Sequence, residues 1–140
     1  MNWLALLVVL GMVPSICQSA QVAVRLVHAT NAPGKAADNE FRDATPRLQK
    51  AFGWREYNVL SRSAVSLRES DVRQMDLGQH LTLRVKLLKD QQPLYLIRCE
   101  LLRDEKDILQ TTVSMTSGSS YFITGRTYDG GQLLISVAVR

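Results

Sequence analysis

The chain has few of the side chains that build catalytic and metal sites. It contains two histidines, His28 and His80, and two cysteines among its 140 residues. The histidines are far apart in the sequence, and neither has partners at the spacing that gives a zinc site its three or four ligands. We therefore expect both histidines to be structural or surface residues, and we predict no metal site and no cofactor.

Motifs of the common enzyme classes are also missing. The sequence has no G-x-S-x-G, H-E-x-x-H or C-x-x-C pattern and no glycine-rich phosphate loop. Ser117, Ser119 and Ser120 have no nearby base that would activate a nucleophile, and a turn explains them better. The sequence therefore predicts no catalytic residue; it leaves enzymatic activity undecided and favours its absence.

Three carboxylates gather at Asp38, Glu40 and Asp43. Such a group could serve acid–base chemistry or bind Ca²⁺. The segment lacks the alternating oxygen ligands and the glycine of a calcium loop, however. We interpret it as a solvated turn.

Charged side chains are absent from residues 1–24 and dispersed in the remainder. The net charge of +4 belongs to residues 25–140, where basic and acidic residues interleave without a block of one sign. Basic stretches with interleaved aromatic residues, which stack nucleic-acid bases, are missing too. We therefore expect no binding to nucleic acid.

The uncharged start contains an apolar run over residues 3–13. This run has the length of a signal-peptide core, whereas a membrane-spanning helix needs about twenty apolar residues. Ser19 and Ala20 offer two cleavage points, so residues 1–20 are predicted to be a signal peptide and the protein to be periplasmic or secreted. An uncleaved anchor and a lipoprotein acylated at Cys17 are the alternatives.

Removal of that segment leaves residues 21–140, a single β-rich domain that is large enough for one hydrophobic core. Cys99 is then the last cysteine, so no disulfide can form within this domain. Cys99 alternates in phase with Tyr95, Ile97 and Leu101, and we expect it to be a buried structural thiol.

One short helix is predicted before the main group of strands. Thr45 is interpreted as the N-cap and Pro46 as the first helical residue, where the missing N–H of proline has no cost. Because proline inside a longer helix would clash with the preceding turn, the helix is expected to run from Pro46 to Phe52 and to stop at Gly53. A separate turn is expected near Asp38.

The other segments alternate apolar and polar residues with the period of two that is typical of strands. In residues 55–68 this alternation predicts one shared face for Tyr57, Val59, Ser61, Ser63, Val65 and Leu67. The predicted strand segments are Gln21–His28, Arg55–Arg68, Val72–Leu77, Leu81–Leu87, Tyr95–Leu101, Leu109–Met115, Tyr121–Thr124 and Leu133–Val139. The pattern predicts a mainly β fold, an antiparallel sandwich or open barrel of seven to eight strands with one short helix.

The segment 111–125 joins a strand with paired threonines to a second strand through a serine–glycine turn. It resembles a hairpin element of bacterial outer-membrane secretins, with Arg126 in place of the second glycine that ends that element. The overall layout is similar to that of small exported Gram-negative bacterial proteins of unassigned function. These resemblances imply a location in the bacterial envelope, but they do not supply a catalytic or binding residue.

Together these features favour a non-enzymatic exported β domain that acts as a protein-interaction module, with another envelope protein as its partner. Sheet edges can bind an extended partner segment by strand addition. The last strand, residues 132–140, is the expected edge. The alternative is a small-ligand-binding protein or hydrolase with a pocket near the helix, and the oligomeric state is left open.

Overall fold

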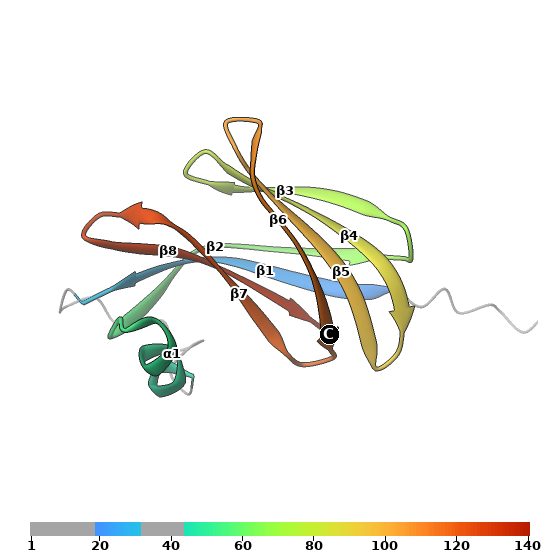
Figure 1. Cartoon of the computed structure of the whole chain (residues 1–140), viewed down its shortest axis with the longest axis horizontal. Coiled ribbons are helices and arrows are strands. Elements are labelled where there is room, and N and C mark those ends of the chain that lie inside the picture. Colours follow the sequence, from blue (N-terminus) through green and yellow to red (C-terminus); the bar gives the residue numbers. More distant parts are fainter. Residues whose placement is uncertain (1–18, 32–43) are drawn as a thin grey trace, which may run out of the picture.

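The computed structural model describes residues 19–31 and 44–140. This part of the chain contains eight β-strands and one α-helix (Figure 1). The elements are, in chain order, β1 (Ala20–Thr30), α1 (Thr45–Phe52), β2 (Glu56–Leu67), β3 (Val72–Gly78), β4 (Leu81–Gln91), β5 (Leu94–Arg103), β6 (Lys106–Thr116), β7 (Ser120–Tyr128) and β8 (Gly131–Val139).

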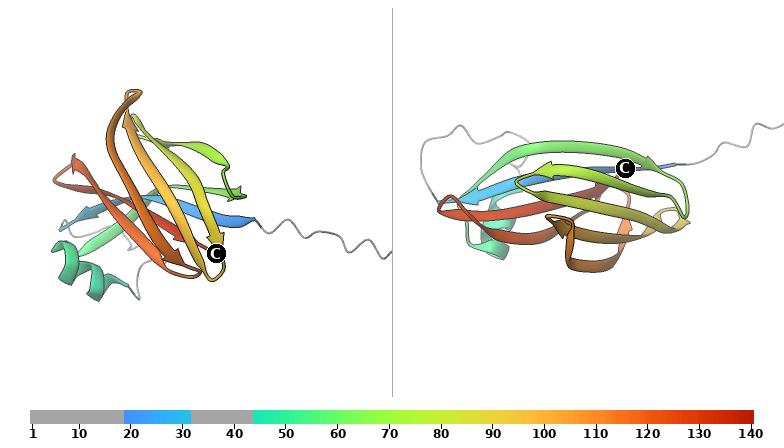
Figure 2. Two further views of the ribbon diagram at one scale, coloured as in Figure 1. Left: turned by 45° about the vertical axis from the view of Figure 1, so that its right-hand side comes forward. Right: turned by 90° about the horizontal axis from the view of Figure 1, so that it is seen from above.

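The strands form two four-stranded sheets. The first sheet has the order β2-β1-β8-β7 and the second has the order β3-β4-β5-β6. All neighbouring strands are antiparallel, and the two sheets lie face to face with their strands crossing at an angle (Figures 1 and 2). The fold is therefore the predicted antiparallel sandwich, and its sheets do not close into a barrel.

Apolar side chains from both sheets fill the space between them. The residues predicted to share a face on β4 and β5 are all buried, and they form one cluster with inner residues of β1 and β8. These β4 and β5 residues are Leu81, Leu83, Val85, Leu87, Tyr95, Ile97, Cys99 and Leu101. Removal of this apolar surface from water, worth roughly 25 cal/mol per Å², holds the sheets together without a disulfide.

A second, smaller cluster lies on the outer face of the first sheet, where α1 packs against it. Leu48 of α1 contacts a group of buried residues on this face: Val27, Ala29, Tyr57 and Leu134. The first sheet is therefore buried on both faces beneath the helix. This explains why β8 reads as a nearly continuous apolar run, with residues 133–137 all fully buried.

The predicted single face of β2 is wrong because the strand contains a β-bulge. Leu26 of β1 lies opposite Ser61, and the next β1 residue, Val27, lies opposite Val59. Leu60 is thus the extra residue of a bulge, which shifts the alternation by one position. Tyr57 and Val59 consequently pack beneath α1, whereas Val65 and Leu67, which follow the bulge, belong to the core between the sheets.

Helix α1 begins one residue earlier than predicted. Its N-cap is Ala44, with no side-chain cap, and Thr45 is already helical, so the predicted threonine cap is wrong. The stop at Gly53 is confirmed: this residue is left-handed at φ 84°, and its N–H donates to the Gln49 carbonyl at 2.7 Å. In residues 19–31 and 44–140, no helix has both the length and the apolar character needed to cross a membrane.

Candidate functional site

The two histidines lie in different parts of the fold, His28 in β1 and His80 in a turn of the second sheet. His28 of β1 places its Nε2 at 3.0 Å from the Tyr128 carbonyl, and its ring meets that of Tyr128 edge-on. His80 lies in the β3–β4 turn, with its Nδ1 at 3.3 Å from an Asp104 carboxylate oxygen and its side chain 76% exposed. Within the described ranges, no three histidine, cysteine or acidic residues lie together as a metal site would require.

Cys99 is buried, as predicted, with 1% of its surface exposed. Burial among apolar side chains raises the pKa of its thiol to about 11, because a thiolate would be poorly solvated there. The thiolate is the reactive form of cysteine. Cys99 is therefore a packing residue and a poor nucleophile at neutral pH.

The serine-rich segment between β6 and β7 forms a turn, but this turn does not close a hairpin. β6 pairs with β5, and β7 pairs with β8, so the chain crosses here from one sheet to the other. The Ser119 hydroxyl donates to the Thr116 carbonyl at 2.6 Å, and the Gly118 N–H donates to the Val139 carbonyl at 2.8 Å. The predicted turn is confirmed, and the predicted pairing of its two strands is wrong.

The carboxylates Asp38, Glu40 and Asp43, the turn near Asp38 and residues 1–18 lie outside the described residues. The interpretation of the carboxylates as a solvated turn therefore stays a prediction. The same holds for the signal peptide.

The last strand is not an edge. β8 lies between β1 and β7, and its residues 132–139 pair with β1 along their whole length. Terminal position in the sequence is a poor guide here, because the first and last strands pair with each other at the centre of the first sheet. The edges of the two sheets are instead β2 and β7, and β3 and β6.

Two of these edges approach each other along one side of the sandwich. The Ser61 hydroxyl of β2 donates to the Leu77 carbonyl of β3 at 2.9 Å, which links the two sheets. Both strands also carry charged residues, among them Arg62 and Arg73. Charged side chains and mutual cover are two ways in which proteins protect strand edges from further pairing.

The opposite side of the sandwich, formed by β6 and β7, carries charged residues only near the strand ends: Lys106 and Asp107 at the start of β6 and Arg126 near the end of β7. From Ile108 to Gly125 the sequence contains no charged residue and no proline. Several large apolar residues of this side are partly exposed: Ile108 at 53%, Leu109 at 40% and Tyr121 at 36%. Ile108 is the extra residue of a β-bulge, since Leu109 faces Leu101 while Asp107 faces Leu102. Beyond this bulge β6 keeps an unbroken register with β5 up to Thr116.

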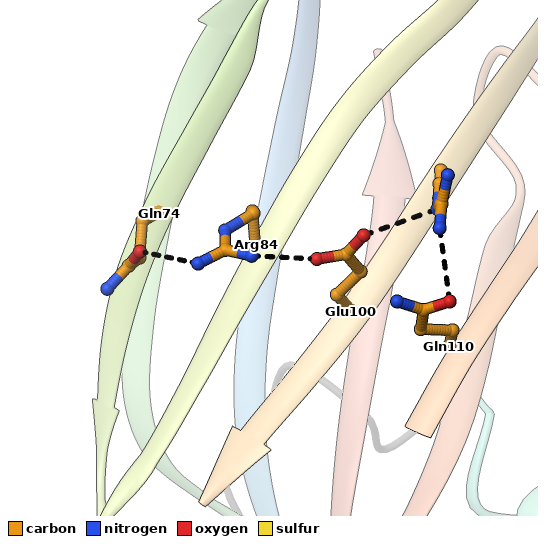
Figure 3. A network of polar contacts seen from close by, with 5 residues as sticks. Gln74, Arg84, Glu100 and Gln110 are labelled. Carbon is orange, nitrogen blue, oxygen red and sulfur yellow. Dashed lines mark hydrogen bonds and ion pairs between the residues drawn. The ribbon is translucent and has the colours of Figure 1, made fainter. Parts of the chain in front are cut away.

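A ladder of polar contacts crosses the outer face of the second sheet and ends on β6 (Figure 3). Arg84 of β4 donates to Gln74 of β3 at 3.5 Å and to a Glu100 oxygen of β5 at 2.9 Å. Arg98 contacts the other Glu100 oxygen at 3.3 Å and donates to the Gln110 side-chain oxygen at 3.0 Å. The polar side chains of this row form hydrogen bonds and ion pairs with one another, so this face offers little surface to an apolar binding partner.

A groove of about 880 Å³ lies between α1 and the outer face of the first sheet. It is open to solvent and combines apolar walls with arginines and serines. Its lining residues are Arg25, Ala44, Arg47, Leu48, Ala51, Phe52, Gly118, Ser119, Ser120, Tyr121, Phe122 and Arg140. The sequence alternative placed a pocket near the helix, but it named none of these residues, because they come from four separate segments.

No protein-family model, curated protein sequence or solved structure matches this chain. The description that holds for residues 19–31 and 44–140 is therefore one of fold class: a two-sheet antiparallel β-sandwich with one helix packed outside. Since such folds serve many unrelated functions, function has to be argued from the surfaces of this molecule.

Proposed function

We propose that this protein is a non-enzymatic binding module of the bacterial envelope that holds an extended segment of another protein against β6. The observation that carries the proposal is the uncharged, proline-free edge from Ile108 to Gly125. The exported location rests on the apolar N-terminal run and on the resemblance to exported Gram-negative proteins.

Strand β6 suits this role better than β7. It pairs with β5 without interruption from Leu109 to Thr116, whereas the β7–β8 register shifts after Thr124. An edge strand in regular register presents alternate N–H and C=O groups to the outside, and these groups bind an added strand through main-chain hydrogen bonds.

The side chains of β6 define the chemistry of the partner segment. On the inner face, Leu109 is 40% exposed and Val113 packs at the margin of the core, so apolar partner residues would extend the core there. On the outer face, the Gln110 side-chain oxygen accepts a hydrogen bond from Arg98. The row of polar contacts thus reaches the edge strand, next to which polar partner residues would lie. We therefore expect a segment of alternating apolar and polar residues.

A pair of matched variants tests the proposal. Leu109→Lys places a charge on the inner side of the β6 edge, where it would block an added strand. Val72→Lys is the control, because Val72 is 44% exposed on the other edge of the same sheet. Proteins from an envelope extract should be retained by the unchanged protein and by Val72→Lys, and at least about tenfold less by Leu109→Lys.

Hydrogen exchange on the complex locates the contact. Alternate amides between Leu109 and Thr116 should become protected when the partner is bound, while amides of β3 should not change. Equal retention by Leu109→Lys and the unchanged protein, or protection confined to another strand, would show that β6 is not the binding edge.

A further inference from the structure

The groove beneath α1 has an apolar part built from two elements. Phe52 of α1 and Phe122 of β7 meet edge to face, with ring centroids 5.8 Å apart. Leu48, which is 5% exposed, and the exposed Ala51 also line this part of the groove. This arrangement leaves aromatic and aliphatic surface accessible along one side of the groove.

The polar part of the groove is positively charged. Arg47 of α1 and Arg140, which follows β8, both line it, and neither side chain has an ion pair or hydrogen bond within residues 19–31 and 44–140. Arg25 also lines the groove, but it is already engaged within the protein. No acidic residue is among the described lining residues, so the groove favours a negatively charged ligand.

From this geometry we propose that the groove binds a single-chain anionic amphiphile, whose carboxylate or phosphate head contacts Arg47 and Arg140. Guanidinium groups form charge-assisted, two-pronged hydrogen bonds with both kinds of head. The apolar chain then lies along Ala51, Phe52 and Phe122. The volume of about 880 Å³ falls within the range of about 300–1,000 Å³ that is usual for ligand sites. This site is distinct from the β6 edge and independent of the proposed function.

Titration calorimetry with four probes tests the charge and the chain separately. The probes are decanoate, decyl phosphate, neutral decanol and inorganic phosphate, each below its aggregation concentration. We expect one-to-one binding of the two amphiphilic anions, at least about tenfold tighter than that of decanol or inorganic phosphate. The tighter of the two anions identifies the head group that the site prefers.

Variants at exposed positions assign the site. The double variant Arg47→Gln and Arg140→Gln should weaken binding of both anions at least about tenfold and leave the affinity for decanol unchanged. Arg103→Gln, on the second sheet, should change none of these affinities. Ala51→Glu, which adds a negative charge to the groove, should also weaken binding of the anions. Ala51→Gln, whose side chain has the shape of glutamate without its charge, should not.

Two results would overturn the proposal. The first is equal affinity for decanoate and decanol, or for decyl phosphate and inorganic phosphate. The second is anion binding that the double arginine variant leaves unchanged. Leu109→Lys should not affect these titrations, so failure of the groove and failure of the β6 edge are separable.

Discussion

Cys99 lies on the inner face of β5, opposite Val85 of β4 and Thr111 of β6 in the cross-strand register. Its surroundings determine its chemistry, since burial raises the pKa of the thiol to about 11. The sequence could predict this location because the alternation along β5 is regular. It could not predict the size of the pKa shift, which depends on the strands that flank β5.

We expect the Cys99 thiol to be protected in the folded protein. In a chain with Cys17 replaced by serine, an aromatic disulfide reagent at pH 8 should label folded protein at least roughly 100-fold more slowly than denatured protein, because labelling requires local opening. Equal rates in the two states would show that β5 does not bury this residue.

The raised pKa of Cys99 also predicts a pH dependence of stability. Below the ordinary thiol pKa of 9.0 the Cys99 thiol is protonated in both the folded and the unfolded protein, so it does not make the free energy of unfolding depend on pH. As pH rises from 9 toward the folded value of about 11, the thiol ionises in the unfolded chain first, so the free energy of unfolding falls. The decline should reach on the order of 2 kcal/mol. Cys99→Ala, although less stable at neutral pH, should show a shallower decline in denaturant titrations.

The β7–β8 hairpin shows, at the scale of an element, how two adjacent glycines serve different purposes. Gly130 is left-handed at φ 72° in the turn, and a Cβ there would meet open space. A Cβ on Gly131 would collide with the Ala29 carbonyl and lie 2.9 Å from the His28 Nε2. The first glycine permits the turn, and the second permits the close approach of β8 to β1.

These two glycines give a matched pair of substitutions. Gly130→Ala should cost about 1–2 kcal/mol, the usual strain of a left-handed alanine. Gly131→Ala should lower the free energy of unfolding further, because its methyl group would meet the backbone carbonyl of Ala29 and the β1–β8 pairing must shift to relieve the collision. Thermal unfolding of the two variants checks this order, and a Gly131→Ala variant that is no less stable than Gly130→Ala would contradict it.

The sequence predicts a structural feature well when residues close to one another in the chain determine that feature. The inner face of β4 follows from its own alternation. The bulge at Leu60 does not, because an extra apolar residue within a strand is revealed only by pairing with β1. The central place of β8 and the groove between Arg47 and Arg140 likewise depend on pairing between distant segments.

At the scale of the whole molecule, the start and the end of the described chain meet at the centre of the first sheet. Gln21 and Arg140 exchange backbone hydrogen bonds of 3.4 and 2.9 Å. Ala20 precedes them as the first residue of β1, faces Leu67, and is fully buried in the core cluster. The boundary between the predicted signal peptide and the domain is therefore also a boundary of the core.

This position of Ala20 distinguishes the two cleavage points that the sequence leaves open. Cleavage after Ser19 keeps the Ala20 methyl group in the core, whereas cleavage after Ala20 removes it together with one residue of the β1–β2 pairing. The lost methyl group alone is worth about 0.8 kcal/mol. We therefore expect the chain that begins at Ala20 to be the more stable product of the predicted cleavage, and an intact-mass measurement shows which product forms. A chain that begins at Gln21 should unfold at a lower temperature than one that begins at Ala20. A mass that retains Met1 would contradict cleavage altogether, and equal melting of the two shortened chains would show that Ala20 adds nothing to the core.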